Sequence, residues 1–104
     1  MTYGRIWIMR IKSSPLFSRQ YKRLEKKHFP VKLIQPAVTA IVIQDKLALR
    51  RLHDHALHNN WAGFRELHPA GKLDNWIMIY NIIEDDGLVL TLVQTGDHKN
   101  VLGI

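Results

Sequence analysis

The 104-residue sequence contains no cysteine, which excludes disulfide bonds, thiolate catalysis and cysteine-ligated zinc. Long apolar runs are also missing, since no stretch approaches the roughly 20 residues that a membrane-spanning helix requires. The opening MTYGRIWIM lacks the long apolar segment and small-residue cleavage site of a signal peptide. We therefore expect a soluble cytoplasmic protein, and the length predicts a single domain over residues 1–104 with one modest core.

Acidic residues are scarce in the first half of the chain. Residues 1–51 hold 12 basic and 2 acidic side chains, whereas residues 52–104 hold 3 basic and 7 acidic ones. This division predicts a cationic region whose natural partner is a polyanion such as RNA. The alternative, that the basic charge serves only solubility, stays open on charge alone.

Two helices are expected in the basic half. Ser14 and Pro15 form an N-cap followed by proline at the first helical position. Phe17, Tyr21 and Leu24 then recur at helical spacing, which predicts an amphipathic helix with a basic outer face. His28-Phe29-Pro30 ends this helix, and a second one follows with apolar side chains at helical spacing and with a proline in its first turn: Ile34, Pro36, Ala37, Val38, Ile41 and Val42.

The remaining segments predict strands. Ile6, Ile8 and Ile11 alternate along a first strand that ends near Lys12. The second half offers three more strands, with Asp86-Gly87 as a hairpin turn, at Phe64–His68, Trp76–Ile83 and Leu88–Gln94. The predicted order is β-α-α-β-β-β. We expect an α+β fold in which an N-terminal helical hairpin packs on one face of a small antiparallel or mixed sheet.

Histidine is abundant, with six in the chain and three of them at positions 53, 55 and 58. Imidazole both takes and gives a proton near neutral pH, which metal-free RNA cleavage requires. His53 and His55 are alternatively spaced as two zinc ligands on a strand, but no further cluster completes such a site.

A family resemblance rests on four motifs in a fixed order. They are D-H-A-L from Asp54, W-A-G-F-R-E-L-H from Trp61, W-I-M-I-Y from Trp76, and T-G-D-H from Thr95. In this combination the sequence resembles the YafQ branch of the RelE/ParE toxin superfamily. Relatives tend to begin near the strand that reads Met9-Arg10-Ile11-Lys12, so we expect residues 1–8 to be an N-terminal extension.

The resemblance implies a RelE-like fold and the toxin of a type II toxin–antitoxin system. Such toxins are endoribonucleases that cut mRNA in the ribosomal A site and are silenced by a RelB/DinJ-type antitoxin. The resemblance implies no metal and no small-molecule cofactor. The basic first half suits an acidic, partly disordered antitoxin that folds as it binds.

The resemblance also implies the site residues. The motif histidines are His55, His68 and His98, and they form the expected acid–base set together with Asp74. We expect RNA contacts from basic residues of the helical half, from one strand arginine and from one tryptophan: Lys22, Arg23, Lys26, Arg50, Arg51, Arg65 and Trp76. Trp61 and Trp76 are most simply packing residues, but Trp76, beside a charged loop, is the better candidate for stacking on a base. Arg65 has the alternative of pairing with a carboxylate.

Several positions depart from the family pattern. Asn75 precedes the tryptophan where aspartate is expected, so Asp74 serves only if the longer loop PAGKLDN bends it into place. Gln94 replaces a common basic residue, which leaves Lys72, Arg65 or a cation of the ribosome as substitutes, and Leu102 replaces a frequent aromatic one. The Gln94 and Asn75 departures keep open an inactive relative that only binds antitoxin or ribosome. A gyrase inhibitor of the ParE type is a further alternative, although that branch lacks the set of several histidines.

Overall fold

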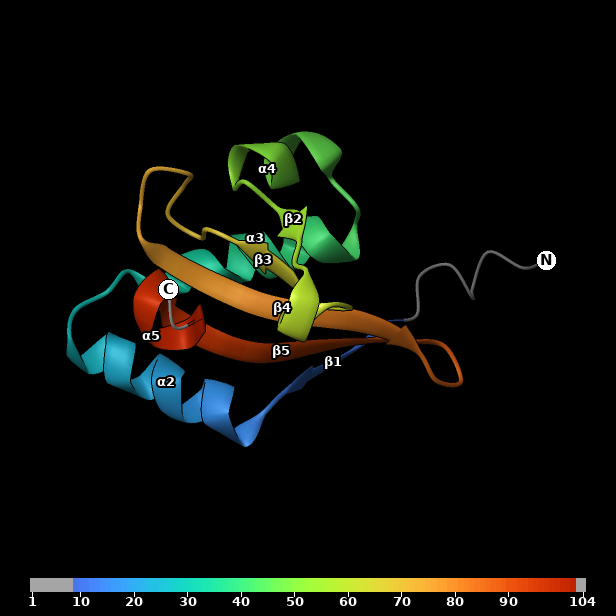
Figure 1. The fold of residues 1–104 in the computed structure, drawn as a ribbon, viewed down its shortest axis with the longest axis horizontal. Coiled ribbons are helices and arrows are strands. Elements are labelled where there is room, and N and C mark those ends of the chain that lie inside the picture. The colour runs from blue at the N-terminus through green and yellow to red at the C-terminus, as the bar shows by residue number, and fades with distance from the viewer. Residues whose placement is uncertain (1–8, 103–104) are drawn as a thin grey trace.

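The computed structural model describes residues 9–102, and these form a five-stranded sheet with helices (Figure 1). The strands are β1 (Met9–Ser13), β2 (His55–Ala56), β3 (Arg65–Leu67), β4 (Trp76–Glu84) and β5 (Leu88–Asp97). The helices are α2 (Pro15–Lys26), α3 (Ile34–Val42), α4 (Lys46–Arg51) and α5 (His98–Leu102), with short 3-10 turns η1 (Val31–Leu33) and η2 (Asn59–Trp61). The predicted extension at residues 1–8 lies outside the described residues.

The strands lie in the order β1-β5-β4-β3-β2. The edge strand β1 runs parallel to β5, and every other neighbouring pair is antiparallel. The sheet is therefore mixed, and the predicted α+β class is confirmed. No helix within residues 9–102 combines the length and the apolar character needed to cross a membrane.

The first helix forms as the sequence predicts. The Ser14 hydroxyl accepts a hydrogen bond from the Phe17 N–H (2.9 Å), and Pro15 occupies the first turn. Phe17 and Leu24 are buried, and the basic residues of this helix stay exposed. The second predicted helix is α3, with Pro36 in its first turn, where the missing N–H leaves no hydrogen bond broken.

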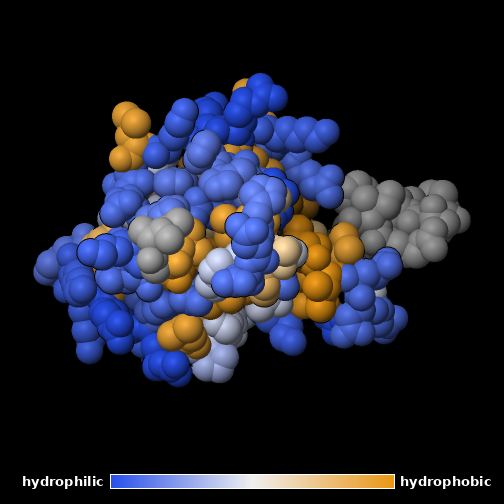
Figure 2. All heavy atoms as spheres, viewed as in Figure 1, coloured by the Kyte–Doolittle hydropathy of each residue, from blue (hydrophilic) through white to orange (hydrophobic). Residues whose placement is uncertain are grey.

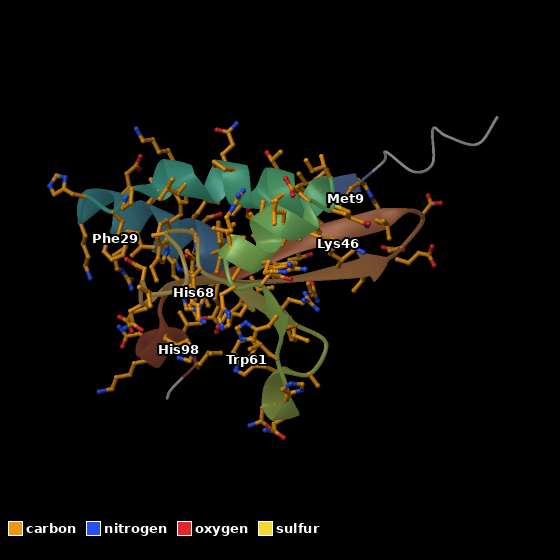
Figure 3. All side chains as sticks on the ribbon, turned by 90° about the horizontal axis from the view of Figure 1, so that it is seen from above. Met9, Phe29, Lys46, Trp61, His68 and His98 are labelled. Carbon is orange, nitrogen blue, oxygen red and sulfur yellow. The ribbon has the colours of Figure 1, made fainter. Side chains whose placement is uncertain are left out.

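The two faces of the sheet are covered differently. The larger core cluster joins α2 and α3 to one face, and its members include Phe17, Ile41, Trp76 and Tyr80. The opposite face carries a smaller cluster of Ile77, Ile79 and Val101, with α5 packed against it. Figure 3 shows α2 and α3 along one side of the sheet, with His98 and Trp61 on the other. The helical hairpin on one face is thus confirmed, and the second face is only partly covered.

Three short elements are additions to the predicted order. The helices α4 and α5 span six and five residues, and β2 spans two. Segments of this length carry too few residues for a hydrophobic period to be read from them. They matter here because β2 contains His55 and α5 begins at His98.

Candidate active site

Glu66, in the middle of β3, is the centre of the candidate site. Its neighbour Leu67 belongs to the core cluster beneath the helices, and because side chains alternate along a strand, Glu66 points to the opposite face. Glu66 is only 1% exposed. A buried carboxylate is costly unless charged or hydrogen-bonding neighbours offset its lost hydration, so its surroundings decide what it does.

Those surroundings are three imidazoles from three separate segments. His55 Nε2 lies 3.2 Å and His68 Nε2 lies 3.4 Å from Glu66 Oε2, and His98 Nε2 lies 3.3 Å from Glu66 Oε1. His55 faces Glu66 across the β2–β3 pairing, and the other two rings approach from the end of β3 and the start of α5. The structure thus brings together the three histidines that the motifs single out.

The rings are held at their other ends as well. Nδ1–H of His55 donates to the His53 carbonyl (2.8 Å), and Nδ1–H of His68 donates to the Asp74 carbonyl (2.7 Å). The His98 backbone N–H donates to the Asn75 carbonyl (3.0 Å), which fixes the start of α5 against the loop before β4. These bonds aim the Nε2 atoms of all three rings at one carboxylate.

One oxygen of that carboxylate is not satisfied. Glu66 Oε1 is buried and has no hydrogen-bond partner within the described residues, although His98 Nε2 lies close to it. His55 and His98 keep 39% and 30% of their side-chain surface, whereas His68 keeps 11%. Two of the imidazoles therefore reach both the buried carboxylate and the solvent, where a substrate arrives.

This arrangement suits proton transfer beside a phosphate. Glu66 balances positive charge on neighbouring imidazoles, and imidazolium donates protons and offsets charge on phosphoryl oxygens. The sequence-based prediction does not include Glu66. The motif R-E-L-H nevertheless indicates Glu66, because side chains alternate along a strand and a residue two positions before His68 lies on the same face as that histidine.

The motif aspartate serves the other face of the sheet. Asp54 Oδ2 accepts hydrogen bonds from Arg65 Nη2 (2.7 Å) and Nε (3.2 Å), and Asp54 Oδ1 accepts one from the Tyr80 hydroxyl. The pKa of Tyr80 is raised by burial and then by Asp54, and the pKa of Arg65 is raised chiefly by its hydrogen bond to Asp54. Arg65 therefore pairs with a carboxylate, the alternative that the sequence left open.

Asp74 lies next to the histidines, but its carboxylate is occupied. Its Oδ1 accepts a hydrogen bond from the Trp76 backbone N–H (2.8 Å), and its backbone carbonyl receives the bond from His68. The longer loop does bend Asp74 towards the cluster. Its direct contact with an imidazole is made by the main chain.

The predicted stacking role of Trp76 is wrong. Trp76 is only 2% exposed, and its Nε1–H donates to Thr95 Oγ1 (2.8 Å) inside the core. The aromatic on the open face is Trp61, which is half-buried, packs edge-on against Phe64 and lines a pocket of about 300 Å³ together with Leu102 (Figure 3). The stacking prediction failed because β4 begins at Trp76 and directs its side chain towards the helices.

The motif T-G-D-H positions α5. Thr95 is buried, and its hydroxyl donates to the Ile77 carbonyl (2.9 Å). A Cβ on Gly96 would lie 3.1 Å from Val101 Cγ2, which is closer than ordinary packing, so glycine allows α5 to fold back against β5. His98 reaches Glu66 as a result.

The cations predicted to bind RNA do not all meet at the histidines. Arg50 and Arg65 line a separate pocket of about 440 Å³ beside Tyr80. Lys22, Arg23 and Lys26 are exposed along α2, and Arg23 also borders a small cleft at the end of β5. Arg51 is exposed in the last turn of α4. Figure 2 shows that most of the visible surface is hydrophilic, with hydrophobic side chains gathered near the β4–β5 hairpin.

The alternative of a zinc site at His53 and His55 gains no third ligand. Within residues 9–102, no group of three or more histidine, aspartate or glutamate side chains is arranged to hold a metal ion. The Nε2 atoms of the three clustered histidines are instead directed at Glu66.

Comparison with protein families matches residues 9–103 to the model of the "Bacterial toxin of type II toxin-antitoxin system, YafQ". No curated protein sequence matches the chain. Among solved structures, YafQ from E. coli BL21(DE3) superposes with a TM-score of 0.75 at 28% identity, over 92% of this chain and all of that one.

Two further solved structures are similar. YafQ in the E. coli DinJ–YafQ complex gives a TM-score of 0.73 at 29% identity, over 92% of this chain and all of that one. A metal-bound toxin from Helicobacter pylori gives 0.69 at 28% identity, over 90% of this chain and 99% of that one. The motifs on both faces of the sheet thus occur in a chain that matches these toxins over 90% or more of its length.

Proposed function

Because this chain belongs to the YafQ family of toxins from bacterial type II toxin–antitoxin systems, we propose that it is an endoribonuclease that cleaves mRNA in the ribosomal A site. The catalytic groups are His55, His68 and His98, assisted by Asp74, and they work by general acid–base chemistry without a metal. The observation that carries this proposal is the convergence of three imidazoles from separate segments on buried Glu66.

The chemistry needs three things at one phosphate. A base removes the proton of the ribose 2′-hydroxyl, an acid protonates the departing 5′-oxygen, and fixed positive charge stabilises the phosphoryl oxygens. Glu66 favours positive charge on the imidazoles around it and keeps their rings aligned. Asp74 contributes through its carbonyl, which holds the His68 ring.

The ribosome presents the mRNA to the toxin, and the basic surface of the toxin binds the ribosomal RNA. Lys22, Arg23 and Lys26 on α2 are exposed, and so are Arg50 and Arg51 on α4. Contacts between such side chains and phosphates are strong at low salt and carry no sequence preference. They fit a role in gripping ribosomal RNA in the cytoplasm while the histidine cluster faces the mRNA.

The proposed inhibitor is a small acidic antitoxin. The E. coli relative is solved as a DinJ–YafQ complex, and the basic half of this chain suits an acidic partner of the same type. Co-expression with an acidic protein encoded beside the toxin is expected to yield a stable complex and to restore growth. If the acidic protein does not co-purify with the toxin, the predicted antitoxin partner is contradicted.

The decisive experiment is brief expression followed by mapping of mRNA 5′ ends. The wild-type protein is expected to arrest growth and to leave mRNA cut at preferred codons. His98→Ala is expected to lower cleavage by about 10²–10⁴-fold, the usual contribution of one acid–base group. Because His98 is partly exposed, the variant should keep its fold, which circular dichroism and its melting temperature verify.

Two outcomes would reject the proposal. Normal toxicity of a folded His55, His68 and His98 triple alanine variant would show that the histidines do no chemistry. Growth arrest with intact mRNA would favour a protein that only binds antitoxin or ribosome, and DNA damage with intact mRNA would favour a gyrase inhibitor.

A further inference from the structure

A fourth histidine, His53, borders the cluster without contacting Glu66. Its ring centroid lies 4.8 Å from that of His55 and 5.5 Å from that of His68. The side chain is exposed, whereas His68 beside it is buried. His53 therefore covers the solvent side of the cluster, where RNA would approach.

The backbone at His53 is left-handed. The residue follows the end of α4 with φ of 57°, a region that glycine and asparagine occupy most easily and that histidine also adopts. Its N–H donates to the Arg50 carbonyl (3.0 Å), and the next N–H, that of Asp54, donates to the Leu49 carbonyl (2.9 Å), a common helix ending that usually contains glycine. These bonds fix the backbone that carries the His53 ring.

The ring nitrogens of His53 are free, unlike those of its neighbours. His55 and His68 each have Nδ1 bonded to a carbonyl and Nε2 directed at Glu66. Neither ring nitrogen of His53 has a hydrogen-bond partner in the part of the chain that the structure describes. A lone pair on this ring is therefore available to a substrate without breaking an existing bond.

The electrostatic surroundings of His53 favour its neutral ring. The pKa of His53 lies below its usual value of 6.5, because partial loss of hydration disfavours the charged ring and because His55, His68 and Lys72 repel positive charge. Glu66 acts in the opposite direction and more weakly. The neutral ring is the form that takes up a proton.

We propose that His53 is a fourth catalytic imidazole, which accepts the proton of the ribose 2′-hydroxyl from RNA bound at the histidine cluster. The proposal rests on the nuclease function proposed above and assigns the acceptor within it. As the 2′-oxygen bonds to phosphorus, the bond from phosphorus to the 5′-oxygen breaks, and a Glu66-bound imidazolium protonates that oxygen. The products are a 2′,3′-cyclic phosphate and a 5′-hydroxyl, so no further reactant is needed.

The chain contains a matched control for the test. His28 follows α2 as His53 follows α4: its φ is 66°, its N–H donates to the Glu25 carbonyl (3.0 Å), and the next N–H donates to the Leu24 carbonyl (3.0 Å). Asparagine fits both positions, so His53→Asn and His28→Asn should be as stable as wild type or more so. Any difference between them then comes from the imidazole at position 53.

The measurement is cleavage of a defined mRNA on ribosomes by the purified full chain, as kcat and KM over pH 5–8.5. His53→Asn is expected to lower kcat by about 100-fold or more with little change in KM, whereas His28→Asn behaves as wild type. In the wild type, kcat/KM should rise through a pKa below 6.5, and this acidic limb should disappear in His53→Asn. His53→Lys, which places a cation at this position but is a poor proton acceptor at neutral pH, should not restore the rate.

Three results would overturn the assignment. Equal kcat for His53→Asn and His28→Asn would show that the fourth ring does no chemistry. A rise in KM alone, or rescue by His53→Lys, would show that position 53 only contacts phosphate. In all three cases the wild type still cleaves RNA and the proposed function stands, whereas a wild type without cleavage removes the function and this inference together.

Discussion

Asp54 and Glu66 are two carboxylates at neighbouring strands that gather side chains on opposite faces of the sheet. Asp54 joins Arg65 and Tyr80 beneath the helices, and both of its oxygens accept hydrogen bonds. Glu66 joins three imidazoles on the other face, and its Oε1 has no hydrogen-bond partner within residues 9–102. The first group is satisfied and the second is left with capacity for further bonding.

We therefore expect Asp54 to contribute to the stability of the fold and Glu66 to contribute to its reactivity. Asp54, which immediately precedes β2, bonds to Arg65 of β3 and Tyr80 of β4 and so links these neighbouring strands. A carboxylate surrounded by imidazoles sits among groups that gain and lose protons in that range. Adjacent motif residues, Asp54 and His55, thus serve two separate purposes because a strand turns them to opposite faces.

Of the changes that compare the two carboxylates, the largest effect is expected from neutralising Glu66 in the histidine cluster. Glu66→Gln keeps the side-chain shape but removes the charge that favours imidazolium, so cleavage should fall by about 100-fold. Glu84→Gln, at the exposed end of β4, is the matched control and should cleave as wild type. Single-turnover cleavage assays measure both. Full activity of Glu66→Gln would show that the buried carboxylate is only structural.

The second expected effect is on stability and not on cleavage. Asp54→Asn weakens the bonds to Arg65 and Tyr80, and hydrogen bonds to a charged group contribute about 1.5–3 kcal/mol, so the free energy of unfolding should fall by about 2 kcal/mol. Urea denaturation measures this change. Tyr80→Phe, which removes one of the two partners, should cost less.

The comparison fails if Asp54→Asn keeps its stability but loses cleavage. Measured on folded protein below its melting transition, this variant should cleave at a rate close to that of the wild type, because Asp54 faces away from the histidines. A rate as low as that of Glu66→Gln would place Asp54 in the catalytic machinery.

The smallest expected effect on function is at the buried tryptophan. Trp76→Phe loses the hydrogen bond to Thr95, whose hydroxyl still donates to the Ile77 carbonyl, and this costs about 1 kcal/mol of stability, to which the cavity left by the smaller ring adds. RNA affinity, measured by fluorescence anisotropy with a labelled oligonucleotide, should not change. A clear loss of affinity in the folded variant would restore the stacking role that burial argues against.

The sequence predicted the elements whose signals lie within one continuous stretch of the chain. Ser14-Pro15 marked the start of α2, the helical spacing of its apolar residues gave its buried side, and Asp86-Gly87 marked the β4–β5 turn. The motif histidines were also identifiable, because the family resemblance fixed them one by one. None of these inferences required knowledge of which strands pair.

The sequence did not reveal features that depend on pairing. Glu66 contacts three histidines only when β2, β3 and α5 meet. Trp76 is buried because β4 lies under the helices. His53 was spaced as one half of a zinc pair, yet its ring packs beside His55 and His68, and its nitrogens have no hydrogen-bond partner among residues 9–102. Contacts between residues far apart in sequence decide each of these cases.

The position of β5 has a consequence for how the protein is made. This strand lies between β1 and β4, pairs Leu88 with Met9, and leads directly into His98. Within the described residues β1 pairs with β5 alone, so during synthesis β1 has no strand partner until almost all of the described chain has been made. A nascent or truncated chain that ends before Leu88 has neither a closed sheet nor its third clustered imidazole. The histidine cluster can therefore assemble only when translation of the described chain is nearly finished.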